Sequence, residues 1–111
     1  FVVKRDIRLD IDDVIAYPNP SKGEVAFRFK HNLFDAVLNV EIEIYDSQGG
    51  LVRILNPGKI TADGYIIDEV KWDGLSNNGA VLRNGLYVCR VKVLDRNGNS
   101  SAYSVKVLMA K

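Results

Sequence analysis

Apolar and polar residues alternate with a period of two along most of this chain. The alternation forms seven runs separated by segments rich in glycine, proline and asparagine, at residues 7–11, 25–31, 38–45, 51–55, 66–73, 87–93 and 103–109. A β-strand sends successive side chains to opposite faces, so each run predicts a strand with one buried and one wet face. The run at 51–55 is shorter and less regular, which predicts a strand near a sheet edge. No stretch shows a helical period of useful length.

The segments between the runs have the chemistry of turns. Residues 46–50 (DSQGG) and 96–99 (RNGN) predict tight hairpins, because glycine and Asn-Gly supply the positive φ that such turns need. Asn56-Pro57-Gly58 is expected to end the 51–55 strand, and residues 74–85 form a longer loop. A parallel sheet would need crossover helices, for which there is no room. The pattern therefore predicts an all-β fold, an immunoglobulin-like antiparallel sandwich of about seven strands.

The length of 111 residues and the 47% content of hydrophobic residues suit one domain with its own core. We assign residues 14–111 to the sandwich and residues 1–13 to the tail of a preceding region or to a first strand. The chain starts at Phe1, within a strand-like pattern, which suggests a piece of a longer protein. No apolar run approaches the roughly 20 residues that span a bilayer, so direct membrane insertion is not expected.

The charges narrow the choice of partner. Fifteen basic and fourteen acidic residues are interspersed and give a net charge of +1. No basic patch of the kind that nucleic acid selects is present, so nucleic acid is not an expected partner. No glycine-rich phosphate loop precedes a helix, and no cofactor is expected.

Catalysis would have to use the single histidine and the single cysteine. His31 ends a strand with the inward parity of Phe29, which predicts a structural or surface residue. Cys89 lies in mid-strand between Tyr87 and Val91 on the apolar face, where burial raises the pKa of a thiol and leaves it inert. We therefore predict no catalytic residue, and no enzyme activity for the chain by itself. Cys89 also has no partner for an internal disulfide.

Metal binding has three weak candidates. His31 and Cys89 are too few for zinc, which takes four ligands. Asp95, Asn97 and Asn99 have the spacing of the first ligands of a calcium loop.

The calcium pattern then fails, because Ser100 stands where the loop needs glycine and Lys106 where it needs a bidentate glutamate. The hairpin interpretation is preferred. An acidic cluster, Asp10, Asp12 and Asp13, could hold calcium together with another loop, but a solvated linker explains it more simply. No metal site is predicted.

Two motifs stand out from ordinary sandwich sequence. The first is Tyr17-Pro18-Asn19-Pro20, followed by Ser21-Lys22-Gly23. The prolines fix φ and remove two ladder donors, which predicts a rigid crossing outside any strand that leads into the strand at 24–31.

The second motif is Trp72-Asp73-Gly74, followed by Asn78-Gly79 and Asn84-Gly85-Leu86-Tyr87. Trp72 is expected to pack in the core at a strand end, with Asp73 capping turn amides and Gly74 permitting the reversal. Gly85 then admits the chain to the next strand, whose Tyr87 returns to the core.

The order YPNP, IYDSQGG, WDG, NNG, NGLYVCRV and KVLMAK resembles the C-terminal sorting domains of the Bacteroidetes type IX secretion system. It is also similar to the related immunoglobulin-like domain of flagellar hook-capping proteins. The resemblance runs from Tyr17 to Lys111. Within this group the chain is most similar to the C-terminal domain of the system's sortase, a gingipain-like cysteine peptidase of the outer membrane.

The resemblance implies a sorting or docking domain of a larger exported protein, at the outer membrane or cell surface of a Gram-negative bacterium. Its partner would be the secretion apparatus or an outer-membrane shuttle protein, met by β-augmentation on an exposed edge. The residues that match the sorting motifs are Gly85 and Tyr87 of the Gly-x-Tyr motif and, in the terminal strand at 106–111, Lys106, Val107, Leu108 and Lys111. The chain departs from the group at Gly49-Gly50, where Gly-Arg or Gly-Lys is usual, and at Cys89, where an aromatic or small residue is common.

Two other functions stay open at this stage. One is a passive spacer that stabilises a surface peptidase. The other is a carbohydrate-binding module, for which Tyr45, Tyr65 and Tyr103 are the available aromatic residues. Strand pairing or core packing explains these tyrosines more simply, and tryptophan is scarce.

Overall fold

The computed structural model describes residues 9–61 and 64–111, which form seven strands. Within these residues there is no helix that could cross a membrane. The strands are β1 (Ile11–Tyr17), β2 (Val25–His31), β3 (Val37–Tyr45), β4 (Leu51–Thr61), β5 (Ile66–Trp72), β6 (Gly85–Leu94) and β7 (Ser100–Met109).

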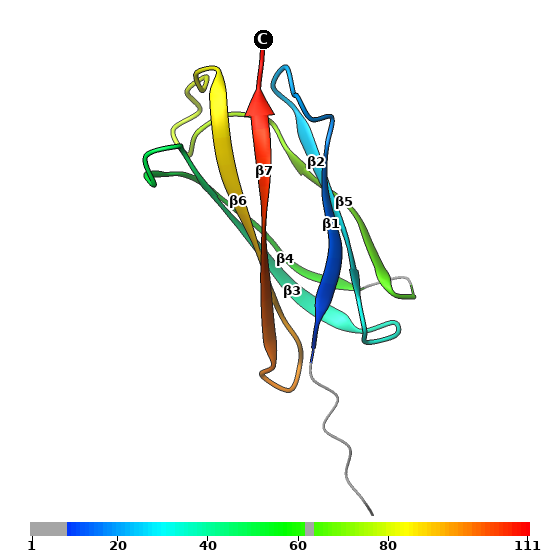
Figure 1. Cartoon of the computed structure of the whole chain (residues 1–111). Coiled ribbons are helices and arrows are strands. Elements are labelled where there is room, and N and C mark those ends of the chain that lie inside the picture. The colour runs from blue at the N-terminus through cyan, green and yellow to red at the C-terminus, as the bar shows by residue number, and fades with distance from the viewer. Residues whose placement is uncertain (1–8, 62–63) are drawn as a thin grey trace, which may run out of the picture.

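The strands form two antiparallel sheets that pack face to face (Figure 1). One sheet has the order β1-β2-β5, and the other has the order β4-β3-β6-β7. The predicted immunoglobulin-like sandwich is thereby confirmed. The edge strands are β1 and β5 of one sheet and β4 and β7 of the other, and across the sandwich β1 lies beside β7 and β4 beside β5.

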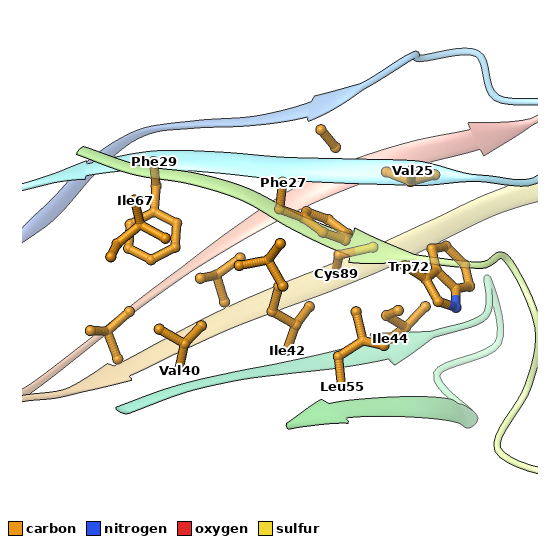
Figure 2. Close-up of a cluster of buried hydrophobic side chains, with 14 of the residues drawn as sticks. Val25, Phe27, Phe29, Val40, Ile42, Ile44, Leu55, Ile67, Trp72 and Cys89 are labelled. Carbon is orange, nitrogen blue, oxygen red and sulfur yellow. The ribbon is translucent and has the colours of Figure 1, made fainter. Parts of the chain in front are cut away.

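The core lies between the two inner faces and is built by the alternation seen in the sequence. Phe27 and Phe29 of β2 face Ile42 and Ile44 of β3, and all four are fully buried (Figure 2). Trp72 closes the core at the end of β5. Each such side chain contributes about 1.5–3 kcal/mol by leaving water, which is why the parity of the runs determines which face turns inward.

β1 differs from the expectation. The sequence predicts a strand at 7–11 and a crossing that includes Tyr17, whereas β1 runs from Ile11 to Tyr17. A bulge between Asp12 and Ile15, with Asp13 at a φ of 50°, interrupts the alternation. The period of two that would indicate a strand is therefore lost in this part of the sequence. Residues 1–8 of the predicted segment 1–13 lie outside the described residues. The last part of that segment belongs to β1.

The solvated-linker interpretation of the acidic cluster is wrong for the same reason. Asp12 and Asp13 lie in β1, and the Asp13 carboxylate is 3.1 Å from Nζ of Lys30 on β2. Both side chains are more than half exposed, so this ion pair adds little stability.

β4 also differs, because Asn56-Pro57-Gly58 does not end it. The strand continues to Thr61, and a bulge between the pairs Val40–Gly58 and Ile42–Leu55 accommodates the extra residue. Proline is tolerated here because β4 is an edge strand, where a missing N–H need not remove a ladder hydrogen bond.

The sandwich has two unlike ends (Figure 1). The loops at 18–24, 46–50 and 73–84 gather at one end together with the C-terminus. Both sequence motifs therefore lie at this end, which we call the motif end.

Candidate functional site

The motif end brings the proline motif against the last strand. Ser21 forms a parallel bridge with Met109: its N–H donates to the Leu108 carbonyl at 2.8 Å, and its carbonyl accepts the Ala110 N–H at 2.8 Å. The Ser21 hydroxyl also binds the Glu24 carbonyl at 2.7 Å and accepts the Gly23 N–H at 3.0 Å. The crossing from β1 to β2 is thus rigid, and it serves as a short extra strand for β7.

Asn19 continues this pairing with its side chain. Nδ2 donates to the Lys106 carbonyl at 2.8 Å, and Oδ1 accepts the Leu108 N–H at 3.0 Å. The amide of Asn19 thereby acts as an added peptide group on the free side of β7. Pro18 and Pro20 flank it, and both of the preceding peptide bonds are cis.

The sorting candidates of the last strand take different positions. Val107 is fully buried, whereas the side chains of Lys106 and Leu108 point to the outer face of the sheet. Lys111 is held in place: its Nζ donates to the Leu82 carbonyl at 2.6 Å, and its N–H donates to Oδ1 of Asn84 at 3.1 Å. The main-chain groups from the Lys106 carbonyl to the Ala110 N–H already pair on the outer edge of β7, so β-augmentation at these groups would have to displace Asn19 and Ser21.

Gly85 and Tyr87 make contacts that support the fold. Gly85 opens β6 opposite Met109 with a φ of 147°. The Tyr87 hydroxyl donates to the Arg83 carbonyl at 2.7 Å, and its ring meets Trp72 edge-on at 6.4 Å between centroids. Burial, together with the negative charge of Asp46, raises the pKa of Tyr87. These two residues hold the motif end together.

The tryptophan motif forms a hydrogen-bonded turn. Trp72 Nε1 donates to the Leu75 carbonyl at 3.0 Å, and the Asp73 carboxylate accepts the Leu75 N–H at 3.0 Å, as the sequence predicts. A Cβ on Gly74 would collide with the Gly23 carbonyl, and its φ is 80°. Gly74 is therefore required for two reasons, and the close approach joins the two motifs.

Sequence reasoning missed two residues that complete this end. Arg53 of β4 donates to the carbonyls of Leu75 and Ser76 at 3.1 and 3.0 Å, and pairs with Asp73 at 3.3 Å. Asn77 binds the free edge of β4: its Oδ1 accepts the Ile54 N–H, and its own N–H donates to the Val52 carbonyl, both at 3.0 Å. The only signal for Asn77 was its place beside Asn78-Gly79 in a polar loop.

His31 and Cys89 are not brought together. Cys89 pairs with Ile44 in the four-stranded sheet and lies near Phe27 and Trp72 (Figure 2), and its burial raises the pKa of the thiol to about 12. His31 ends β2 four residues beyond Phe27, about 13 Å along the strand. Its Nδ1 accepts the Leu33 N–H at 3.2 Å, and burial lowers its pKa.

The calcium-like spacing forms a hairpin turn. Asp95 Oδ1 accepts the N–H groups of Asn97 and Asn99 at 2.8 and 2.9 Å, and Oδ2 accepts Nδ2 of Asn99 at 3.1 Å. Burial by itself would raise the pKa of Asp95, but these hydrogen bonds hold it below the ordinary value. Over residues 9–61 and 64–111, no three His, Cys, Asp or Glu side chains gather to hold a metal.

The three tyrosines do not form a platform. Tyr45 lies on the outer face of the four-stranded sheet, opposite Val88. Tyr103 has the opposite parity on β7, opposite Val91. Tyr65 stacks edge-on against Phe34 at 5.1 Å beside His31, away from the motif end.

Comparison with known proteins agrees with this geometry. The family described as FlgD Ig-like domain matches residues 16–98. Among solved structures, the crystal structure of dimeric latent PorU from Porphyromonas gingivalis matches 98% of this chain. The two sequences are 37% identical over the match, and the TM-score is 0.79. The matching region covers 10% of that chain, so the present chain spans about a tenth of PorU.

FlgD from P. aeruginosa matches 92% of this chain and 69% of its own length, with a TM-score of 0.55. At 17% identity this likeness shows the fold alone. No curated protein matches the chain.

Proposed function

This chain belongs to the FlgD Ig-like domain family, and we propose that it is the non-catalytic sorting and docking domain of a larger exported bacterial protein. The observation that supports this best is the 37% identity to PorU over 98% of the chain, which includes both motifs and the last strand. On this proposal the parent is a gingipain-like peptidase or another type IX protein. The site of action is the outer membrane or cell surface, and the partner is the secretion apparatus or an outer-membrane shuttle protein.

The geometry supports recognition of a folded end rather than of a free tail. Asn19, Ser21 and Asn84 fix the main chain of residues 106–111, so a partner meets a rigid surface. A rigid surface loses little conformational entropy on binding, which favours affinity. The groups offered to a partner are outward side chains such as Lys106 and Leu108, while Val107, Gly85 and Tyr87 support the fold.

The test removes the proposed sorting residues at the end of the last strand and keeps the rest of the parent protein. We expect deletion of residues 106–111 to leave the parent inside the cell, measured as its accessibility to added protease on intact cells. Unchanged surface display of the deletion variant would refute the proposal.

A second variant controls for misfolding, because the deletion also removes part of β7. Replacement of the whole domain by an unrelated, stable β-sandwich gives a folded parent without the motif end. We expect this chimera to stay unsorted too. Normal sorting of the chimera would show that the domain is only a spacer.

A further inference from the structure

The outer face of the four-stranded sheet carries an apolar area at the motif end. In the strand register, Leu86 lies opposite Leu108, and Tyr45 lies between Val88 and Leu51. Ile54 follows Leu51 on the same face, opposite Glu43. The area thus takes side chains from all four strands. We call it the outer patch; its members are Tyr45, Leu51, Ile54, Leu86, Val88 and Leu108.

Beyond the patch this outer face is largely polar. Next to the patch, Lys92 lies 3.5 Å from Glu41 and 3.8 Å from Glu43. Among the described residues at the far end of this face, Leu94 is the one large exposed apolar residue, between Asn39 and Ser100. The patch is therefore a local departure from the polar outer surface that an antiparallel sheet normally presents to water.

The exposure of the patch is large enough to matter. Leu51 is 47% exposed, Leu86 and Leu108 are 40% exposed, and Ile54 is 37% exposed. Together with the half-buried Tyr45 and Val88, the patch offers roughly 300 Å² of apolar surface, the size of the largest and often functional patches on monomers. A standard interface takes about 800 Å² per partner, so this patch suits the apolar centre of an interface with a polar rim.

The charges at the rim indicate what kind of surface would cover the patch. Arg90 and Lys106 are exposed on the same face, where Lys106 lies opposite Val88 and Arg90 opposite Glu43. Among the described residues neither cation has a carboxylate within ion-pair distance, whereas Lys92 beside them has two. A second copy of the chain, docked by a two-fold axis at the patch, would crowd these cations together. Carboxylates on a different protein would complement them.

A hollow at the rim offers a place for an anchoring side chain. It has a volume of about 400 Å³ and is lined by Val81, Leu82, Leu86 and Tyr87, with Asp46 and Arg83 at its polar side. Binding energy concentrates where a large side chain fills such a pocket at an interface.

We infer that the outer patch docks a protein surface whose apolar side chains are bordered by carboxylates, with Arg90 and Lys106 as the specificity-determining cations. The inference rests on the proposed function in one respect, that the partner meets this domain during export. It deepens that proposal by extending recognition from the outward side chains of β7, Lys106 and Leu108, to a face built from four strands.

The test uses the full-length parent in its own bacterium, with the photoreactive amino acid p-benzoylphenylalanine in place of Ser104. Ser104 lies on the outer face opposite Arg90 and is exposed. The same probe at Ser100, at the far end of the face, is the matched control. We expect one dominant adduct from position 104, at least tenfold stronger than from position 100, with the cross-linked partner segment rich in Asp or Glu.

The double variant R90E/K106E is expected to reduce the adduct at least tenfold, and L86K to do the same. The controls K59E and L94K change exposed residues at the far end of the same face and are expected to leave the adduct unchanged. All five substitutions concern outward side chains, and resistance of the parent to limited proteolysis checks that each of the four variants is folded.

The inference is overturned by an adduct that survives R90E/K106E, by equal adducts from positions 100 and 104, by no adduct, or by an adduct with a second copy of the chain. Its failure is separable from failure of the sorting proposal. Loss of surface display in the 106–111 deletion, combined with any of these results, would keep the sorting role and reject the patch.

Discussion

The sandwich has two long sides, one where β1 lies beside β7 and one where β4 lies beside β5, and they are closed differently. The β1–β7 side is bonded at both ends: the Ile11 N–H donates to the Ser101 hydroxyl at 3.3 Å, and Asn19 and Ser21 bind β7 at the motif end. On the β4–β5 side, the side-chain hydrogen bonds of β4 among the described residues lie at the motif end, through Arg53 and Asn77. Further along it lies a hollow of about 430 Å³ lined by Leu55, Ile60 and Val70.

The difference shows two ways to protect a sheet edge from pairing with other chains. On β7 a loop occupies the free hydrogen-bonding groups. On β4 Asn77 occupies the edge at the motif end, and beyond it the edge is unsuitable for pairing, because Pro57 lacks an N–H and a bulge distorts the strand. Four sets of variants test this contrast.

The largest effect is expected at Gly74, where the loops that close the two sides touch. Gly74→Ala would place Cβ against the Gly23 carbonyl at a positive φ, and should lower the free energy of unfolding by about 2–4 kcal/mol. Urea unfolding measures this loss of unfolding free energy. The control Gly79→Ala has a similar φ of 79° in open space and should lose only about 1 kcal/mol. Equal losses for the two variants would show that the contact with Gly23 is unimportant.

Removing the asparagine caps should affect the β7 edge more than the β4 edge. Asn19→Ala removes two hydrogen bonds and should lower the free energy of unfolding by about 1–3 kcal/mol, against about 0.5–1.5 kcal/mol for Asn77→Ala, which removes one from its side chain. Urea unfolding gives both values. Hydrogen exchange gives the site: Leu108 N–H should exchange faster in the first variant and Ile54 N–H in the second. The reverse order of stabilities would contradict the contrast between the sides.

Restoring a donor to the β4 edge tests the other mode of protection. Pro57→Thr should change the free energy of unfolding by less than about 1 kcal/mol, because the position is exposed on an edge. It should promote self-association, measured by sedimentation at high protein concentration. Thr61→Val on the same strand is the control. A strictly monomeric Pro57→Thr variant would show that the bulge alone protects the edge.

The smallest effect concerns pH at the far end of the β1–β7 side, where His31 pairs with Ile11. Burial lowers the pKa of His31 below 6.5, so the unfolded chain takes up a proton before the folded one does. Stability should therefore be unaffected above pH 6.5 and should decline as the pH falls below it. His31→Asn, which keeps an acceptor for the Leu33 N–H, should flatten this decline in unfolding curves between pH 7.5 and 5.5. An unchanged slope would assign the decline to other groups.

The elements that the sequence predicted well are those with unbroken alternation. β2, β3, β6 and β7 contain the expected runs, and inward positions such as Phe29, Ile42 and Val91 are fully buried. The misses fall where a bulge interrupts the pattern, at Asp13 in β1 and at Pro57 in β4. A bulge adds one residue to a strand, so that the side chains beyond it turn to the other face of the sheet. Where the bulge falls depends on the partner strand, which the sequence of the bulged strand does not identify.

The candidate site divides in the same way. Trp72, Asp73 and Gly74 were predicted in their local roles, because a turn depends on neighbours in the chain. The roles of Asn19 and Asn77 were not predictable, since each depends on an edge strand far away in the sequence: Asn19 and Lys106 are 87 residues apart.

The amino-acid sequence alone determined that the chain buries alternate residues in a two-layered β fold, and that it turns at particular glycines and prolines. These properties are local, since they depend on successive side chains and on the φ angles a residue tolerates. The tertiary structure decided which strands are edges, which loops cover them, and which outward side chains meet in the outer patch. Those outcomes depend on register between distant strands, which the order of residues within any one strand does not specify.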